Sequence, residues 1–263
     1  MSIDSIVFMV ILICIIIFFI CYSLSLKESY QSQIYNVIHL KDNQKRRLKL
    51  EQRFIDKKLH YFEAIDTRND LWKLYSFYLE NEQIQELIEY NLYQTRKSHK
   101  NLLPGAVGCF LSHIFLYKQL LSTAPSSFII IEDDVVPNHS FFRKSSFLQQ
   151  NMPQNIDIIL LDYIALHRLE HKIEYKGLQF VRIHQFFLLT AYIISKQGII
   201  NILNAFKKDN YKIKVQYDFY LSQLIQRGIL TVIGINPKLC QQDQQGKSQI
   251  QGGYILENSN YSL

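Results

Sequence analysis

Short apolar runs alternate with longer amphipathic segments along this chain, and that alternation limits its fold more than any other feature of the sequence. Residues 34–40 (IYNVIHL), 126–136 (SSFIIIEDDVV) and 156–164 (IDIILLDYI) each contain a β-branched apolar run typical of a buried strand. The segments between such runs, for example 195–208, carry apolar residues at helical spacing. The sequence therefore predicts an α/β fold with a mainly parallel, Rossmann-like sheet flanked by helices.

Other segments fit the same pattern. We expect a charged helix within 41–58, a strand over 59–66, one or two helices over 73–93, a loop that turns into a helix over 102–121, a helix capped near Asn138 or Ser140, a pair of strands within 176–195, and a helix over 217–228 that ends at Gly228. The carboxyl ends of the parallel strands are where ligands bind in such sheets.

The size and charge of the chain narrow its class. With 263 residues, 48% of them hydrophobic and 20% charged, it can bury one substantial core or two small ones. A net charge of +6 favours an anionic partner such as a nucleotide, a phosphate-bearing acceptor or an acidic membrane surface, although ordinary variation also produces such an excess. No long basic run with interleaved aromatic residues is present, so the sequence does not predict nucleic-acid binding.

The four cysteines form no paired motif. Cys14 and Cys21 lie in the apolar N-terminal stretch, and Cys109 and Cys240 stand alone in the body of the chain. The absence of a CxxC pair argues against a zinc ribbon or a dithiol redox motif. A single Cys109–Cys240 disulfide is one alternative.

The N-terminal stretch is apolar enough to cross a membrane. Residues 5–26 contain no charge, with Asp4 before them and Lys27 after them. About 20 apolar residues span a bilayer as a helix, and the basic start and small-residue cleavage site of a signal peptide are missing. We therefore expect residues 1–33 to be an uncleaved single-pass anchor and stem. The basic residues on its C-terminal side favour a cytoplasmic body, and a lumenal, type II orientation is the alternative.

Three consecutive acids end one of the predicted strands. Glu132, Asp133 and Asp134 follow the apolar run FIII, at the place where a ligand is expected. Carboxylates are hard oxygen ligands of the kind that Mg²⁺ and Mn²⁺ prefer. In an extended chain Glu132 and Asp134 would share one side, where Asp134 could hold a metal, while Asp133 would bond a sugar or base hydroxyl. The alternative is an exposed acidic turn.

Residues 104–113 (PGAVGCFLSH) form a second cluster. Gly105 and Gly108 permit close approach of the backbone, and the N-terminus of the following helix offers N–H groups to an anion. Ser112 and His113 would then lie where a diphosphate could meet them. Alternatively the segment is a simple turn and His113 a structural histidine.

A further carboxylate opens the last predicted helix. Asp218 could act as a catalytic base, or it could simply be favoured by the helix dipole at this position. Asp162, which ends the strand IDIILLD, is a competing candidate. His167 and His171 lack a third metal ligand, and we expect them on the surface.

Together these segments resemble glycosyltransferase family 25, whose bacterial members build lipopolysaccharide and whose animal members glycosylate collagen. Five segments match the family pattern in order: GAVGCFLSH (105–113), IEDDV (131–135), TAYIISKQG (190–198), YDFYL (217–221) and PKLCQQDQQGKSQI (237–250). The resemblance covers roughly 34–250, which would be the glycosyltransferase domain, with 251–263 as a C-terminal tail.

The resemblance implies a GT-A type fold, a nucleoside-diphosphate-sugar donor (a UDP-hexose) and a divalent Mn²⁺ or Mg²⁺. It assigns the metal to Glu132 and Asp134, and catalysis to Asp218 as the base. It assigns donor binding to one group of residues: His39, Arg46, Gly108, Ser112, His113 and Asp133.

The opening motif departs from the family. Where the family has Val-Ile-Asn-Leu-x-Arg-x-x-x-Arg, this chain reads VIHLKDNQKR, so His39 replaces the asparagine and Asp42 the first arginine, while Arg46 keeps the second. The expected reaction is inverting transfer of a hexose, galactose or glucose, to a glycan, lipooligosaccharide or protein acceptor. The alternative is a degenerate member that binds nucleotide or glycan without turnover. A Mg²⁺-dependent phosphohydrolase or nucleotidyltransferase would share the acids but would not explain GCFLSH or TAYIIS.

Overall fold

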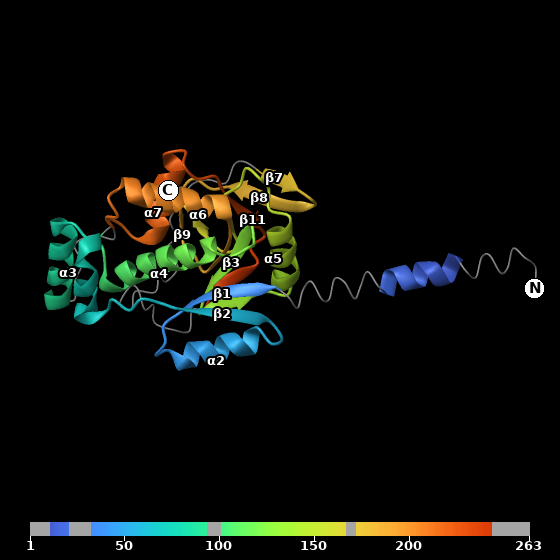
Figure 1. The fold of residues 1–263 in the computed structure, drawn as a ribbon, viewed down its shortest axis with the longest axis horizontal. Coiled ribbons are helices and arrows are strands. Elements are labelled where there is room, and N and C mark those ends of the chain that lie inside the picture. Colours follow the sequence, from blue (N-terminus) through green and yellow to red (C-terminus); the bar gives the residue numbers. More distant parts are fainter. Residues whose placement is uncertain (1–10, 21–32, 94–100, 167–171, 244–263) are drawn as a thin grey trace, which may run out of the picture.

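The computed structural model describes residues 11–20, 33–93, 101–166 and 172–243. Its centre is one eight-stranded sheet with strand order β2-β1-β3-β10-β5-β11-β8-β7 (Figure 1). The strands are β1 (Ile34–His39), β2 (Lys58–Glu63), β3 (Ser127–Glu132), β5 (Ile158–Leu160), β7 (Lys172–Tyr175), β8 (Leu178–Arg182), β10 (Ala191–Ser195) and β11 (Val232–Asn236). Two small two-stranded sheets complete the fold: β4 (Val135–Pro137) with β12 (Cys240–Gln242), and β6 (Ile164–Ala165) with β9 (Phe186–Phe187).

The sheet is mixed. β1 pairs in parallel with β2 and β3, and β5 pairs in parallel with β11. β10 runs antiparallel to β3 and β5, and β8 runs antiparallel to β11 and β7. Most strands therefore share one direction, as predicted, but β10 and β8 run against the others. A single antiparallel strand placed between β3 and β5 keeps the carboxyl ends of both at the same edge of the sheet.

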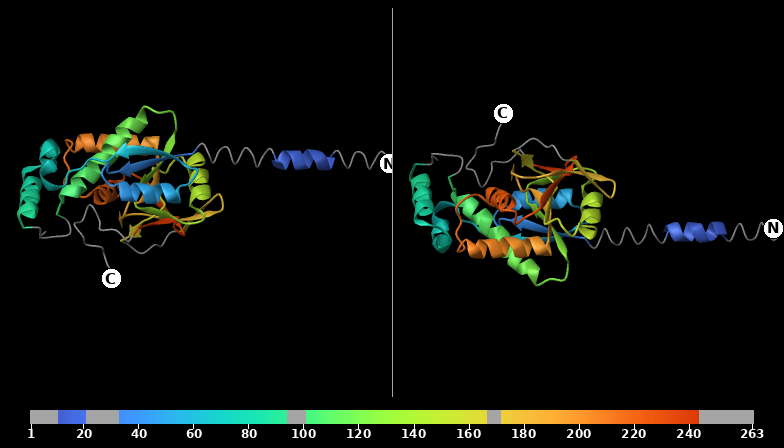
Figure 2. Two further views of the ribbon diagram at one scale, coloured as in Figure 1. Left: turned by 90° about the horizontal axis from the view of Figure 1, so that it is seen from below. Right: turned by 90° about the horizontal axis from the view of Figure 1, so that it is seen from above.

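Helices cover both faces of this sheet. They are α2 (Gln44–Arg53), α3 (Asn81–Tyr93), α4 (Pro104–Leu121), α5 (Phe141–Gln150), α6 (Lys196–Lys208) and α7 (Tyr217–Gln226), together with the 3₁₀ segment η1 (Asn69–Tyr78). Figure 1 and Figure 2 show α4, α6 and α7 gathered on one side of the strands and α2 on the other. The predicted one or two helices over 73–93 are thus η1 and α3.

The strands are buried on both faces because alternate side chains feed two cores. In β3, Phe128 and Ile130 pack with the core beneath α4, α6 and α7, while Ile129 and Ile131 pack with the core beneath α2 and α5. All four are almost inaccessible to solvent. This double burial explains why the strand reads as a continuous apolar run instead of an alternating one.

At two helix ends the local sequence explains where the helix begins or ends. Pro104 stands in the first turn of α4, where its missing N–H costs nothing. The predicted loop containing Gly105 and Gly108 is therefore wrong, because both glycines lie inside the helix. At the C-terminal end of α7, Gly228 follows the capping residue and has φ +67°. The predicted end of this helix at Gly228 is thus confirmed.

The predicted anchor lies mostly outside the described residues. Residues 11–20 are helical and exposed, whereas 1–10 and 21–32 are not described. Within the described parts of the chain no helix combines the length and the apolar character needed to cross a membrane. His167, His171 and the tail at 251–263 also lie outside the described residues.

Candidate active site

The three acids lie where two parallel strands end. In the register between β1 and β3, Ile38 pairs with Glu132, so His39 lies beside the turn that follows β3. The backbone N–H of Glu132 donates to the carbonyl of Thr190, at the start of β10 (2.8 Å). Asp162 follows β5 two places along the sheet. The acids thus occupy the carboxyl edge of the sheet, as predicted.

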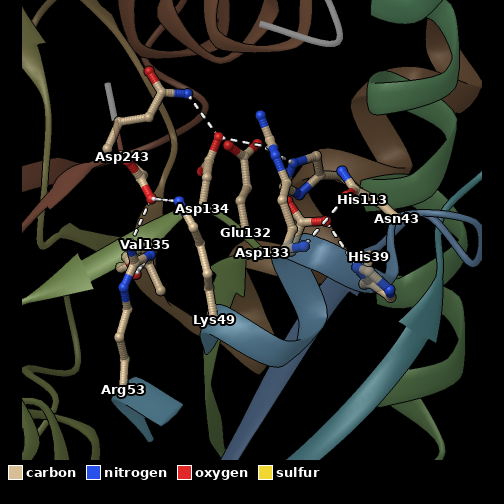
Figure 3. Close-up of polar contacts among 12 residues, drawn as sticks. His39, Asn43, Lys49, Arg53, His113, Glu132, Asp133, Asp134, Val135 and Asp243 are labelled. Atoms are coloured by element: carbon tan, nitrogen blue, oxygen red, sulfur yellow. Dashed lines mark hydrogen bonds and ion pairs between the residues drawn. The ribbon is translucent and has the colours of Figure 1, made fainter. Parts of the chain in front are cut away.

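Arg46 of α2 reaches into this cluster. Its Nη1 donates to Asp133 Oδ1 (2.8 Å) and to Asp134 Oδ2 (3.0 Å), and His39 Nδ1 lies 2.8 Å from Asp133 Oδ2. Figure 3 shows the carboxylates of Glu132 and Asp134 next to one another, with Asp133 turned towards His39. Strand β3 ends at Glu132 and residues 133 and 134 form a turn, so the predicted strict alternation does not continue past Glu132. Asp133 and Asp134 consequently share one guanidinium.

The cluster is buried, which excludes the alternative of an exposed acidic turn. Only 6% of Asp133 and 5% of Asp134 is accessible to solvent. Burial, together with the neighbouring carboxylates, raises the pKa of Glu132 and of Asp134 to about 7, although Arg46 opposes the shift. Burial by itself would lower the pKa of Arg46, but the charges of Asp134 and Asp133 leave it raised overall. One guanidinium therefore does not neutralise all of this negative charge.

The donor set of Glu132 and Asp134 fits a hard divalent cation. Among the described residues Oδ1 of Asp134 is buried without a hydrogen-bond partner. A buried carboxylate oxygen without a partner, next to a second carboxylate whose pKa is raised, is stabilised by a cation with oxygen preference. Mg²⁺ and Mn²⁺ commonly bind through one or two carboxylates together with phosphate oxygens of the substrate.

Gly108 and Ser112 hold a loop against α4. A Cβ on Gly108 would lie 2.2 Å from the carbonyl oxygen of Ile65 and 2.5 Å from Thr67 Oγ1, so only glycine fits. The hydroxyl of Ser112 donates to the carbonyl of Gly108 (2.6 Å) and accepts from the backbone N–H of Ile65 (2.8 Å). Both residues face this loop and are buried, and their assignment to donor binding stays a prediction.

That loop lines a cavity at the ends of β1 and β2. The cavity has a volume of about 360 Å³ and is lined by residues of three segments: Leu40, Lys41, Asp42, Glu63, Ala64, Ile65, Asp66, Arg68 and Tyr75. Hydrogen bonds from Arg68 lower the pKa of Asp66 although burial opposes the shift. Asp42, where the chain departs from the family motif, lines the same cavity. Asp42 is close to His39 in the sequence.

His113 is buried within a tyrosine network. Its Nδ1 lies 2.8 Å from the hydroxyl of Tyr192, which contacts the hydroxyl of Tyr117 at 2.7 Å. Tyr217 donates to Tyr117 (2.9 Å) and stacks on the imidazole with ring centroids 4.5 Å apart. Burial lowers the pKa of His113 to about 3, so the ring is neutral. Its Nε2 points to Glu132, with Oε1 at 3.9 Å.

Asp218 lies in the first turn of α7, half-buried, where its Oδ1 accepts the backbone N–H of Phe219 (2.8 Å). Burial raises its pKa to about 6, and the charge of Glu132 contributes to the shift. The competing Asp162 is 2% exposed and lies 3.5 Å from Lys238 Nζ. Among the described residues Asp218 forms no such ion pair, so it is the more available base of the two.

The sequence did not point to several residues around the acids. Gln242 Nε2 donates to Asp134 Oδ2 (3.1 Å), and Asp243 accepts from Arg53 (2.5 Å). Cys109 lies on α4 with its sulfur within 4.8 Å of ligand atoms of His113 and Glu132. It is a free thiol, as is Cys240, so the alternative of a Cys109–Cys240 disulfide is wrong. Cys109 and Gln242 fall within the matching segments GAVGCFLSH and PKLCQQDQQGKSQI, which is the signal that could have identified them.

Comparison with known protein families identifies the family of this chain. The model of "Glycosyltransferase family 25 (LPS biosynthesis protein)" matches residues 32–221. The chain belongs to glycosyltransferase family 25. A human relative, "Procollagen galactosyltransferase 2", is 30% identical over 118 residues, which cover 43% of this chain and 19% of the relative. "Glycosyltransferase 25 family member" of Drosophila melanogaster is 26% identical over 176 residues, 64% of this chain and 27% of the relative.

These relatives are much longer than the matched segments, which span 19% of the human relative and 27% of the Drosophila melanogaster relative. The family match contains every site residue predicted from the sequence, from His39 to Asp218. Lys238, Gln242 and Asp243, which contact the site's acids or their neighbours, follow the matched segment.

Proposed function

We propose that this family 25 protein transfers a hexose from a UDP-sugar to a hydroxyl group of a glycan, lipooligosaccharide or protein, with inversion and with Mn²⁺ or Mg²⁺ bound at Glu132 and Asp134. The observation that carries the proposal is the buried pair of carboxyls with raised pKa at the carboxyl edge of the sheet, one of them with an unpartnered oxygen. Galactose is the first candidate sugar, because the human relative is named a galactosyltransferase. A GT-A type arrangement of the domain is part of the same proposal.

In the proposed transfer reaction, the residues of the site have separate roles. When bound, the cation neutralises charge on the departing nucleoside diphosphate. Arg46 and His39 orient Asp133 and hold its carboxylate beside the carboxyl end of β1. The neighbouring cavity receives the nucleoside, and Asp42 and Arg68 determine its polar contacts. Asp218 removes the proton from the acceptor hydroxyl, a contribution of about 10²- to 10⁴-fold in rate.

A donor panel tests this proposal. The purified full chain is incubated with Mn²⁺ and each of several sugar nucleotides, with and without a hydroxyl acceptor, and released nucleoside diphosphate is measured. Release from UDP-galactose or UDP-glucose that depends on the cation supports the proposal. Asp134→Asn should abolish it, whereas Asp56→Asn, an exposed site, should not. Normal transfer by a folded Asp134→Asn variant would contradict the metal assignment.

A binding protein without turnover is the second candidate, and one contact favours it. Arg46 occupies an oxygen of Asp134 as well as one of Asp133, so a cation must share Asp134 with the guanidinium. On this hypothesis UDP binds and protects the protein from thermal unfolding, while the donor panel yields no nucleoside diphosphate for any sugar.

The membrane anchor belongs to the proposal too. Residues 1–33 would hold the transferase domain, residues 34–250, at a membrane surface, with the body in the cytoplasm. Fractionation of cells that express the full chain, followed by protease treatment of sealed vesicles, tests both points. Recovery of the chain in the soluble fraction would contradict the anchor, and protection of the body within vesicles would favour the lumenal orientation.

A further inference from the structure

A soft ligand, a nitrogen ligand and a carboxylate converge beside the acid cluster. Cys109 and His113 are one helical turn apart on α4 and therefore share a face of that helix. Glu132 meets this face from the end of β3. Their ligand atoms, one from each residue, all lie within 4.8 Å of one another. Figure 3 shows His113 and Glu132 approaching each other from these two elements.

His113 is already oriented as a metal ligand would be. Its Nδ1 is engaged with the hydroxyl of Tyr192, while its Nε2 is buried and has no hydrogen-bond partner among the described residues. The side chain is 1% exposed, and the unpartnered nitrogen faces Glu132. Ligating histidines typically use their second nitrogen in this way, since an outer hydrogen bond fixes the ring and its tautomer. A bound cation would satisfy this buried nitrogen, which otherwise pays the cost of desolvation.

We propose that Cys109 Sγ, His113 Nε2 and the Glu132 carboxylate bind a borderline-soft divalent cation, for which Zn²⁺ is the natural candidate. Sulfur, imidazole and carboxylate together suit Zn²⁺, whereas Mg²⁺ avoids thiolate. Three protein ligands leave a fourth position, and the partial exposure of Glu132 (20% of its side chain) gives that position access to solvent. On binding, the thiol of Cys109 loses its proton to solvent and the sulfur donates to the metal.

The surroundings of Cys109 agree with this assignment. Burial raises the pKa of the thiol, and the charges of Glu132 and Asp218 raise it further, so the free thiol stays protonated. A nearby divalent cation reverses both effects, because it supplies the positive charge that the thiolate lacks.

If the protein is the transferase proposed above, two cations compete for one ligand. Glu132 belongs both to this site and to the Mn²⁺ or Mg²⁺ site of the transferase. Zn²⁺ bound to Cys109 and His113 would therefore withdraw Glu132 from the hard cation and inhibit transfer. Replacement of Cys109 should relieve this inhibition without changing the basal requirement for Mn²⁺.

Cobalt binding tests the site without any sugar transfer. Metal-free full-length protein is titrated with Co²⁺, and thiolate-to-cobalt charge-transfer absorption is recorded. We expect this absorption in the wild type and its displacement by Zn²⁺. It should disappear in Cys109→Ser and persist when Cys14, Cys21 or Cys240 is replaced by serine. Tyr192→Phe, which removes the outer partner of His113 together with the contact to Tyr117, should weaken binding by about 10- to 100-fold.

Circular dichroism of each variant checks folding. Cys109→Ser replaces one sulfur by oxygen, so it should fold even if His113→Asn, at a fully buried position, does not. No thiolate absorption in the wild type, or unchanged absorption in Cys109→Ser, would overturn the proposal. Because this readout requires no donor, a negative donor panel with a positive cobalt titration would reject the transferase and leave the soft-cation site standing.

Discussion

The guanidinium Nη1 of Arg46 lies 3.0 Å from Oδ2 of Asp134, a carboxylate 88 residues further along the chain. This contact ties α2 to the turn after β3, and the same nitrogen also binds Asp133. It is the main compensation for the charge of the buried acids in the described structure.

Replacement of Arg46 should destabilise the fold. Arg46→Ala leaves Asp133 and Asp134 buried without their cation, and removal of one partner of a buried pair typically costs about 3–5 kcal/mol. Chemical denaturation measures this loss. Arg47→Ala on the same helix is the control, because its pair with Glu51 is exposed and should contribute little. Equal stability of the two variants would show that the acids need no guanidinium.

The unfolding free energy should fall as pH rises through the range of the acid cluster. Glu132 and Asp134 have folded-state pKa values of about 7, above the usual values of about 4 for unfolded carboxyls. The folded state thus holds more protons than the unfolded state between about pH 4 and 7, so stability decreases across this window. Urea denaturation at several pH values should show a shallower decrease for Asp134→Asn than for the wild type. Asp56→Asn should follow the wild type.

Mutation of Asp218 should remove the base without removing donor binding. Asp218→Asn should lower kcat by about 10²- to 10⁴-fold. In the wild type the rate should rise with pH through about 6, since the carboxylate must be deprotonated to accept a proton. The variant should lose this rise. If Asp162→Asn caused the same loss while Asp218→Asn transferred normally, Asp162 would be the base instead.

Gly108→Ala should be the most damaging glycine substitution that we propose. The added Cβ would meet the backbone carbonyl of Ile65, which cannot move aside as a flexible side chain could, so we expect a cost of about 3 kcal/mol. Gly228→Ala is the comparison, because nothing lies within 4 Å of its Cβ and only the positive φ is unfavourable, at about 1 kcal/mol. Thermal unfolding compares the two variants. If Gly228→Ala lowered the melting temperature more than Gly108→Ala, the loop at 65–67 would be able to move away from the added Cβ.

Much of the sheet could be predicted from the sequence because its strands are buried on both faces. The runs at 34–39 and 127–132 are apolar, β-branched and bounded by polar residues, so their positions follow from local pattern. Their direction does not: an apolar run such as Ala191–Ser195 reads the same whichever way it pairs. The glycines of α4 led us to predict a loop where the helix begins. A glycine occupies position 108 of the helix because residues 65–67 pack against it, and this tertiary contact leaves no local signal in the sequence.

The site, too, could be predicted only in part from the sequence. The acids at the end of β3 could be recognised because charge at the end of a buried strand is unusual, and the resemblance to the family added Arg46 and His39. The contact between Gln242 and Asp134 joins residues 108 positions apart, and the approach of Cys109 to Glu132 depends on how α4 packs on the sheet. The matching segments point to Cys109 and Gln242 as residues, but neither contact leaves a local pattern, so the contacts themselves could not be predicted.

The pairing of β12 with β4 completes the surroundings of this site. β12 brings Gln242 and Asp243 to the acids and to Arg53, and Lys238 before it reaches Asp162. A ribosome exposes these residues after nearly all the others in the domain, so the acid cluster remains open while the chain is being made. A fragment cut at residue 221, where the family match ends, would keep every predicted site residue and still lack the strand that closes the site.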